Sequence, residues 1–215
     1  MNSIALALSG SGVDLGGIDP YVYAAIGIAV VFAAVWALVR GGRGDAMVEL
    51  ARWCEGRGLA YVPSADPAVV GRFEGAVDGR SVTIDVVRIA RRALTDLPPV
   101  MTRISCRAET ARGPVLIQPA AWAMTVEGDD LPPRVATGSH AFRERWAVYA
   151  ADAAAGERLV VESVQRRLME DDAEGLGLFV GNGQVMTAQP GIVAGAREGD
   201  RRVAVVCGLS RLIDP

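Results

Sequence analysis

A length of 215 residues accommodates one ordinary domain with a terminal segment and is short for two domains. All 22 basic residues are arginine and the net charge is −3, which argues against the basic face of nucleic-acid-binding domains, so we expect no nucleic acid partner. The three cysteines, Cys54, Cys106 and Cys207, form an odd and widely spaced set, which favours reduced thiols in the cytosol over a disulfide framework.

The first predicted element is an uninterrupted apolar run over residues 21–39, which follows a tail of residues 1–20. At a rise of 1.5 Å per residue the run would form a helix of roughly 28 Å, close to the ~30 Å hydrocarbon core of a bilayer. A cleaved signal peptide normally has a basic start, which residues 1–20 lack, and a buried core helix normally has a shorter apolar run. Residues 21–39 therefore predict one transmembrane helix, with the lipid bilayer as its partner.

The residues at the two ends of this run predict its orientation. Interfacial aromatic and basic side chains are expected at Tyr21, Tyr23, Trp36, Arg40 and Arg43. Only acidic charges precede the run, basic ones follow it, and positive charge favours the cytoplasmic side. The abundance of arginine, alanine and glycine is typical of a GC-rich bacterial genome. We therefore expect a single-pass protein of the bacterial inner membrane, with its N-terminus outside and its large domain in the cytoplasm.

Small residues recur at every fourth position of the same run, at Ala25, Ala29, Ala33 and Ala37. This spacing places them on one helix face, where small side chains allow a second helix to approach closely. The face predicts a helix–helix contact with another membrane protein or with a second copy of this chain. The alternative is that alanine is simply abundant throughout the sequence.

Residues 40–58 are predicted to form a basic flank and a short helix next to the membrane. Asp45 is a suitable N-cap, an apolar stripe runs from Met47 to Cys54, and Gly56 and Gly58 end the pattern. The remaining residues, 59–215, are expected to form one soluble domain.

The first half of this domain reads as consecutive strands. The clearest signal is a hairpin in which residues 72–77 and 80–89 meet at Asp78-Gly79, a dipeptide typical of type I′ turns. Polar Ser81, Thr83 and Asp85 alternate with apolar residues, so one face of this strand is expected to be buried. Short connections favour antiparallel pairing of the further strands predicted at residues 59–62, 100–108, 115–117 and 142–149.

The second half mixes helices with one more hairpin. Residues 157–169 show the apolar stripe of an amphipathic helix. Residues 176–180 and 184–187 are predicted to pair around Asn182-Gly183. Apolar residues after Asp200 have helical spacing, but Gly208 leaves helix and strand both open. The expected fold class is α+β: one N-terminal transmembrane helix, then a domain with an antiparallel sheet containing two hairpins and two or three packed helices.

A strand with Phe142, Trp146 and Val148 is followed by an acidic turn at Asp152, a helix and an Asn-Gly hairpin. This order, together with the segment from Gly58 to the Asp-Gly turn upstream, resembles a group of membrane-anchored bacterial proteins of unknown function. The resemblance covers residues 55–190 and implies a cytoplasmic α+β domain. Members of the group commonly have two membrane helices, whereas this chain predicts one, and the resemblance implies no catalytic residues.

The sequence offers few groups for catalysis or metal binding. His140 is the single histidine, and no Gly-x-Ser-x-Gly motif accompanies it. The cysteines lack the paired spacing of zinc sites. No catalytic, cofactor-binding or metal-binding residue is therefore predicted, and no cofactor is expected.

One group of basic residues remains as a candidate binding patch: Arg88, Arg91, Arg92, Arg103 and Arg107. Such a patch would suit anionic lipid headgroups or an acidic partner protein. The alternative is that these arginines lie on solvated strand faces and at the ends of turns, since acidic residues are interspersed among them.

These features favour a membrane-tethered, non-enzymatic interaction or structural module at the cytoplasmic membrane face. The alternative is a noncanonical membrane-bound enzyme that uses carboxylates. An enzyme requires a concave pocket with convergent ionisable groups, whereas an interaction module presents an exposed patch.

Overall fold

The computed structural model describes residues 45–89, 99–124, 131–193 and 195–215. The chain divides into two compact units, Met1–Asp45 and Ala46–Pro215, and the second contains the folded domain. The predicted tail, the predicted span at residues 21–39, its interfacial residues and its alanine face all lie outside the described residues.

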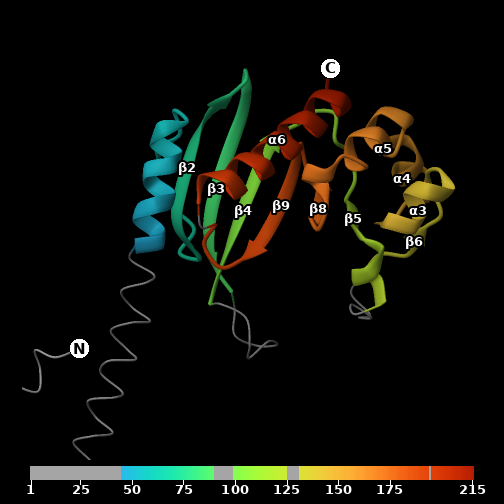
Figure 1. Ribbon diagram of the computed structural model, residues 1–215, viewed down its shortest axis with the longest axis horizontal. Helices are drawn as coiled ribbons and strands as arrows, with labels where there is room; N and C mark the ends of the chain where they lie inside the picture. Colours follow the sequence, from blue (N-terminus) through green and yellow to red (C-terminus); the bar gives the residue numbers. More distant parts are fainter. Residues whose placement is uncertain (1–44, 90–98, 125–130, 194) are drawn as a thin grey trace, which may run out of the picture. The chain divides into compact units, whose positions relative to one another are not determined.

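One antiparallel sheet organises the domain (Figure 1). Its nine strands, counted over the described residues, lie in the order β1-β2-β3-β4-β9-β8-β5-β7-β6. Their bounds are β1 Ala60–Tyr61, β2 Val69–Val77, β3 Arg80–Arg88, β4 Val100–Arg107, β5 Val115–Pro119, β6 Arg134–Val135, β7 Trp146–Ala150, β8 Leu178–Gly181 and β9 Gln184–Pro190. Strands β8 and β9, late in the chain, lie in the middle of the sheet and join its two halves.

The two predicted hairpin turns are confirmed. In the β2–β3 hairpin, Asp78 and Gly79 have φ values of 50° and 77°, and in the β8–β9 hairpin, Asn182 and Gly183 have φ values of 54° and 76°. A type I′ turn requires positive φ at both central residues, and its twist matches that of the flanking strands. Asn, Asp and Gly tolerate this conformation, which is why the local sequence was sufficient to locate both turns.

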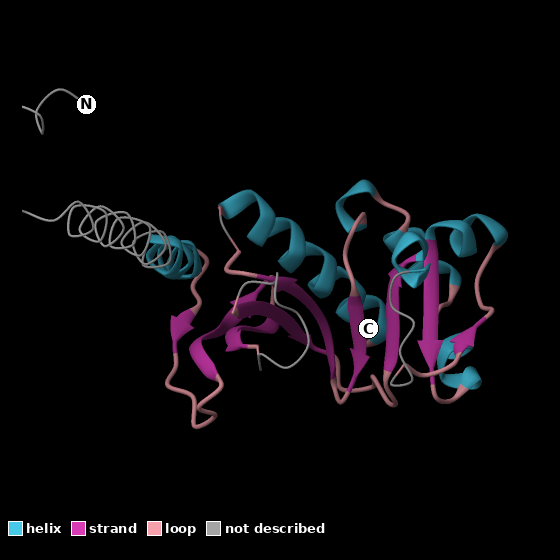
Figure 2. Ribbon diagram, turned by 90° about the horizontal axis from the view of Figure 1, so that it is seen from below, coloured by secondary structure: helices cyan, strands magenta, loops and turns pink. Residues whose placement is uncertain are grey.

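The helices of the described residues pack mainly on one side of this sheet (Figure 2). Residues 45–56 form a first helix, and the later ones are α3 His140–Arg145, α4 Ala153–Leu159, α5 Glu162–Leu168 and α6 Ala196–Ile213, with 3₁₀ turns η1 Ala120–Met124 and η2 Asp171–Ala173. α6 packs on β3, β4 and β9, and α5 packs on α6. The segment after Asp200, open between helix and strand from its sequence, is thus helical.

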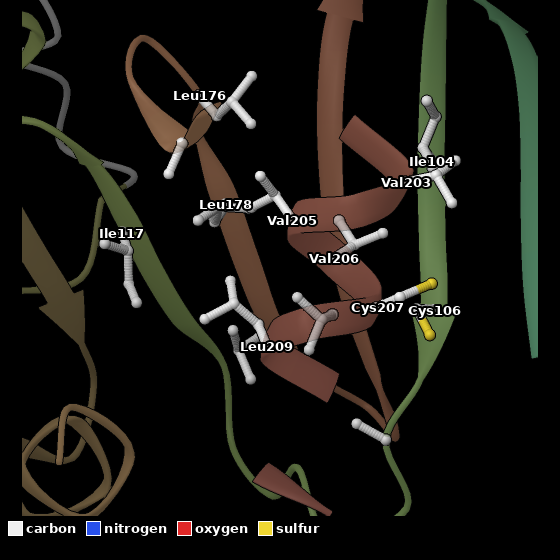
Figure 3. Packing of buried hydrophobic residues seen from close by; sticks show 14 of the residues in the cluster. Ile104, Cys106, Ile117, Leu176, Leu178, Val203, Val205, Val206, Cys207 and Leu209 are labelled. Carbon is white, nitrogen blue, oxygen red and sulfur yellow. The ribbon is translucent and has the colours of Figure 1, made fainter. Parts of the chain in front are cut away.

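The core forms where α6 meets the sheet (Figure 3). Val203 and Cys207 of α6 face Ile104 and Cys106 of β4, while Leu178 of β8 lies beside Val205. All six side chains are buried to at least nine tenths. Burying each such side chain contributes about 1.5–3 kcal/mol relative to leaving it in water, so this layer holds the two halves of the sheet together.

Two predicted elements are wrong in their local structure. The segment predicted as one strand, residues 142–149, begins as helix α3, because Ser139 caps it by accepting a hydrogen bond from the Phe142 N–H at 3.2 Å. The segment predicted as one helix, residues 157–169, is divided between α4 and α5. The break falls at Val160 and Val161, whose backbone leaves the helical conformation: Val160 has φ −87° and ψ 52°, and Val161 has φ −70° and ψ 167°.

The expected fold class is also wrong and is corrected by the structure. Among the described residues, no helix combines the length and the apolar character needed to cross a membrane. The longest of them, α6, carries charged residues such as Glu198, Arg201 and Arg202 along its length. The two hairpins are parts of one larger antiparallel sheet, which has nine strands in the described part of the chain, because β9 pairs with β4 and β8 pairs with β5.

Candidate functional site

The face of the sheet opposite α6 is the candidate site, and strand alternation determines its composition. Successive side chains of a strand point to opposite faces, and directly paired residues of neighbouring strands share a face. On β3, Ile84 points towards α6 and is buried, so Thr83 and Asp85 point to the opposite side. Their partners Glu74 and Arg72 on β2, and Ser105 and Arg103 on β4, lie there too. We call this surface the open face.

Asp85 is at the centre of the open face and accepts hydrogen bonds from two arginines. Arg72 Nε lies 2.7 Å from Asp85 Oδ1, and Arg72 Nη2 lies 3.2 Å from Oδ2. Arg103 Nη2 lies 3.1 Å from the same Oδ2. The hydrogen bond to Asp85 raises the pKa of Arg72. Asp85 is only 8% exposed, so its charge is compensated by both neighbours, as a buried carboxylate requires.

This group lies in a shallow depression with a volume of about 290 Å³. Its lining is Arg72, Glu74, Thr83, Asp85, Arg103, Ser105, Gln184 and Met186. Most of these side chains are polar, and the two guanidinium groups already share one carboxylate. The depression therefore presents a set of positioned hydrogen-bonding groups without a free, buried acid or base.

Beyond β9, the open face becomes apolar. Met186 on β9 is paired with Phe179 on β8, Phe179 with Leu116 on β5, and Leu116 with Tyr149 on β7. Phe179, Leu116 and Met186 are each partly exposed. The open face thus combines a charged half over β2, β3 and β4 with an apolar, aromatic half over β9, β8 and β5.

Comparisons with known proteins support the fold alone. No family model matches the chain, and no curated protein matches it. One solved structure shares the architecture: the crystal structure of the mycobacterial trehalose monomycolate transport factor A, TtfA. It matches with a TM-score of 0.54 and 14% sequence identity, over 79% of this chain and 96% of that chain.

Three of the five arginines of the predicted patch lie within the described residues, and these three are spread along the sheet. Arg88 is exposed at the end of β3, and Arg107 is exposed at the far end of β4, where it pairs with Glu109 at 2.9 Å. Arg88 is level with Val100 in the sheet, so about 23 Å of strand separates it from Arg107. Arg103 pairs with Asp85, while Arg91 and Arg92 lie outside the described residues.

The other groups considered for chemistry lie apart from the open face. His140 begins α3 with an exposed side chain, and its Nδ1 lies 3.4 Å from a Glu144 carboxylate oxygen. All three cysteines are free and buried. Burial raises the pKa of Cys54 to about 12, and the hydrogen bond with Cys106 together with burial raises that of Cys207. Within the described ranges, no three His, Cys, Asp or Glu residues gather as a metal site.

Sequence reasoning missed the pairing of Asp85 with Arg72 and Arg103. The signal for the first pair was present, because Arg72 and Asp85 are equally distant from the predicted turn at Asp78-Gly79, so a tight hairpin makes them direct partners. No comparable local signal existed for Arg103. Its position depends on the register between β3 and β4, whose connection is long.

Proposed function

We propose that this chain is a non-enzymatic interaction module that serves a membrane transport system for lipids, with the domain at the cytoplasmic face of a bacterial membrane. Its open face would bind a membrane-protein partner. The observation behind this proposal is the composition of the open face. Its apolar half lies beside Asp85, whose charge is already compensated by Arg72 and Arg103.

Protein interfaces commonly have an apolar, aromatic centre and a polar rim, with arginine enriched and unpaired charges depleted. Phe179, Leu116 and Met186 supply the apolar part, and Arg72 and Arg103 lie beside it. Because Asp85 is already hydrogen-bonded to both arginines, covering this group with a partner would leave no uncompensated carboxylate.

The transport role is supported by the likeness in fold to TtfA, a mycobacterial trehalose monomycolate transport factor. The cytoplasmic location is supported by the three buried, unpaired cysteines, since free thiols persist in reducing compartments.

Site-specific photo-crosslinking in the native bacterium tests the proposal on the full-length chain. The photoreactive residue p-benzoylphenylalanine would replace Thr83, Ser105 or Phe179 on the open face, one at a time. Matched controls would carry it at Glu157 on α4 or Arg166 on α5, both exposed on the helical side. We expect the three open-face positions to crosslink to one and the same membrane protein, identified by mass spectrometry, and the control positions to leave it unlabelled.

Equal crosslinking from the control positions, or open-face crosslinks to soluble proteins alone, would contradict the proposal. A second measurement tests the location: a fluorescent protein that matures only in the cytoplasm, fused after Pro215, should fluoresce and sediment with the membrane fraction. A fusion that is dark, or that remains in the soluble fraction, would refute the proposed location.

A further inference from the structure

A second cavity lies on the helical side of the domain, between α4 and the C-terminal end of α6. Its volume is about 300 Å³, at the lower end of the range for small-molecule sites. Its lining is Thr110, Ala111, Arg112, Gly113, Val115, Ala155, Arg158, Leu159, Val180 and Ile213. α6 and α4 cover neighbouring parts of the sheet. The cavity lies between the two helices, above β5 and β8.

Six of the ten residues that line this cavity are apolar, and they form one part of its wall. Val115 on β5 and Val180 on β8 are direct partners in the sheet, so their side chains lie on the same face and form the floor. Ala155 and Leu159 lie on α4, and Ile213 is the last residue of α6. The apolar part of this wall suits one hydrocarbon chain, because burying the chain removes apolar surface from water and contributes about 25 cal/mol per Å².

Two arginine side chains also line the cavity. Arg158 is 71% exposed and makes only a surface ion pair, with its Nη2 3.2 Å from Asp152 Oδ2. Arg112 is exposed and makes no ion pair within the part of the chain that the structure describes. Two acidic residues lie nearby, and both already form ion pairs with other arginines. Glu109, after β4, pairs with Arg107, and Asp214, after α6, pairs with Arg80. The cavity is therefore electropositive.

We propose that this cavity binds a single-chain amphiphile with an anionic head group. The hydrocarbon chain would lie over Val115 and Val180, and a carboxylate or phosphate head would lie between Arg112 and Arg158. Guanidinium groups bind both kinds of oxyanion through paired, charge-assisted hydrogen bonds. This site goes beyond the proposed function, because it lies on the face of the sheet opposite the partner-binding surface and uses different residues.

Binding of matched probes to the purified full-length chain, kept in a bulky sterol-based detergent, tests the site by calorimetry. Decanoate and decyl phosphate share a chain and differ in the source of the negative charge. Decyltrimethylammonium has the same chain with a positive head, and inorganic phosphate has the charge without a chain. We expect one decanoate or decyl phosphate to bind per chain. The cationic amphiphile and inorganic phosphate should each bind at least tenfold more weakly.

Two variants and one control locate the binding. Arg112→Gln should weaken decanoate binding about tenfold or more, and Ala155→Phe, which fills the cavity, should abolish it. Arg166→Gln is the matched control, because Arg166 is an exposed arginine on α5 that pairs with Glu162. Circular dichroism would confirm that each variant is folded.

Equal binding of the cationic amphiphile, or unchanged binding in Arg112→Gln, would overturn the proposal. Binding of inorganic phosphate as tight as that of decyl phosphate would replace it with a simple anion site. Because none of these residues lies on the open face, loss of amphiphile binding leaves the crosslinking result unchanged, so the two proposals fail independently.

Discussion

Gly75 on β2 shows how closely the strand passes the end of the first helix. A Cβ added at Gly75 would stand 2.6 Å from the carbonyl oxygen of Gly58 and 3.0 Å from Leu59 Cδ2. Backbone atoms cannot move aside as a flexible side chain can. The absence of a side chain at this position therefore allows the chain after the helix to lie against the sheet.

Gly75→Ala should therefore destabilise the domain by about 1–3 kcal/mol, the usual range for overpacking. The measurement is the free energy of unfolding from urea titration followed by tryptophan fluorescence. Gly56→Ala is the matched control: a Cβ at Gly56 meets nothing within 4 Å, and the residue is helical, so alanine should stabilise by up to about 1 kcal/mol. A neutral Gly75→Ala variant would show that the helix end yields easily.

At the scale of single residues, the sequence located the turn residues Asp78 and Asn182 correctly because their conformation depends on immediate neighbours. The candidate site was harder to foresee. Arg103 was assigned to a basic patch, whereas the structure pairs it with Asp85. A charge count cannot distinguish a solvated arginine from one that neutralises a buried acid, since the difference lies in strand register.

At the scale of elements, α6 is held to its neighbours by an arginine and carboxylate network. Glu198 Oε1 lies 2.7 Å from Arg202 Nε and 2.9 Å from Arg201 Nη2. Arg201 also donates to the backbone carbonyls of Asp172 and Glu174, in and next to η2. The side chain of Arg202 is only 10% exposed, so Glu198 compensates a largely buried charge. Hydrogen bonds from Arg201 and then from Arg202 lower the pKa of Glu198.

Glu198→Gln should lower the free energy of unfolding at pH 7 by about 1–3 kcal/mol, because it leaves Arg202 without its counter-charge. A carboxyl whose pKa is lower in the folded state stabilises the fold above its ordinary pKa of 4.5, and this contribution is lost as pH falls through the folded value. The difference between the wild-type chain and the variant should therefore be constant from pH 7 to about 5 and shrink below pH 4.

Urea titrations at pH 7, 5 and 3 measure this difference. Glu162→Gln on α5 is the control, since its pair with Arg166 is almost fully solvated and should contribute less than about 0.5 kcal/mol. A Glu198→Gln effect that does not change between pH 7 and pH 3 would mean that packing, and not charge, explains the destabilisation.

At the scale of the whole domain, the central position of the β8–β9 hairpin determines how the sheet unfolds. β9 pairs with β4 and β8 pairs with β5, so separating the two halves of the sheet requires breaking this hairpin away from one neighbour. α6 packs on β3, β4 and β9, which ties the same region to the helical layer. β1 and β6, each two residues long, form the sheet edges.

Hydrogen exchange followed by mass spectrometry should therefore show the slowest amides in β4 and β9, exchanging only through global unfolding. Amides of β1 and β6 should exchange through local opening at a much lower free energy. The comparison is internal, because both sets of peptides come from one sample. If β5, β7 and β8 exchanged together well before β4, the domain would consist of two independently unfolding halves.

The sequence by itself determined the features that depend on neighbouring residues. These are the two type I′ turns, the alternation that buries one side of β3, and the antiparallel pairing within each of the two hairpins. The tertiary structure alone decided the strand order, the division of residues 157–169 into α4 and α5, and the meeting of Asp85 with Arg103. Each of these depends on contacts between residues far apart in the chain. The free energy of such contacts cannot be read from a local pattern of residues.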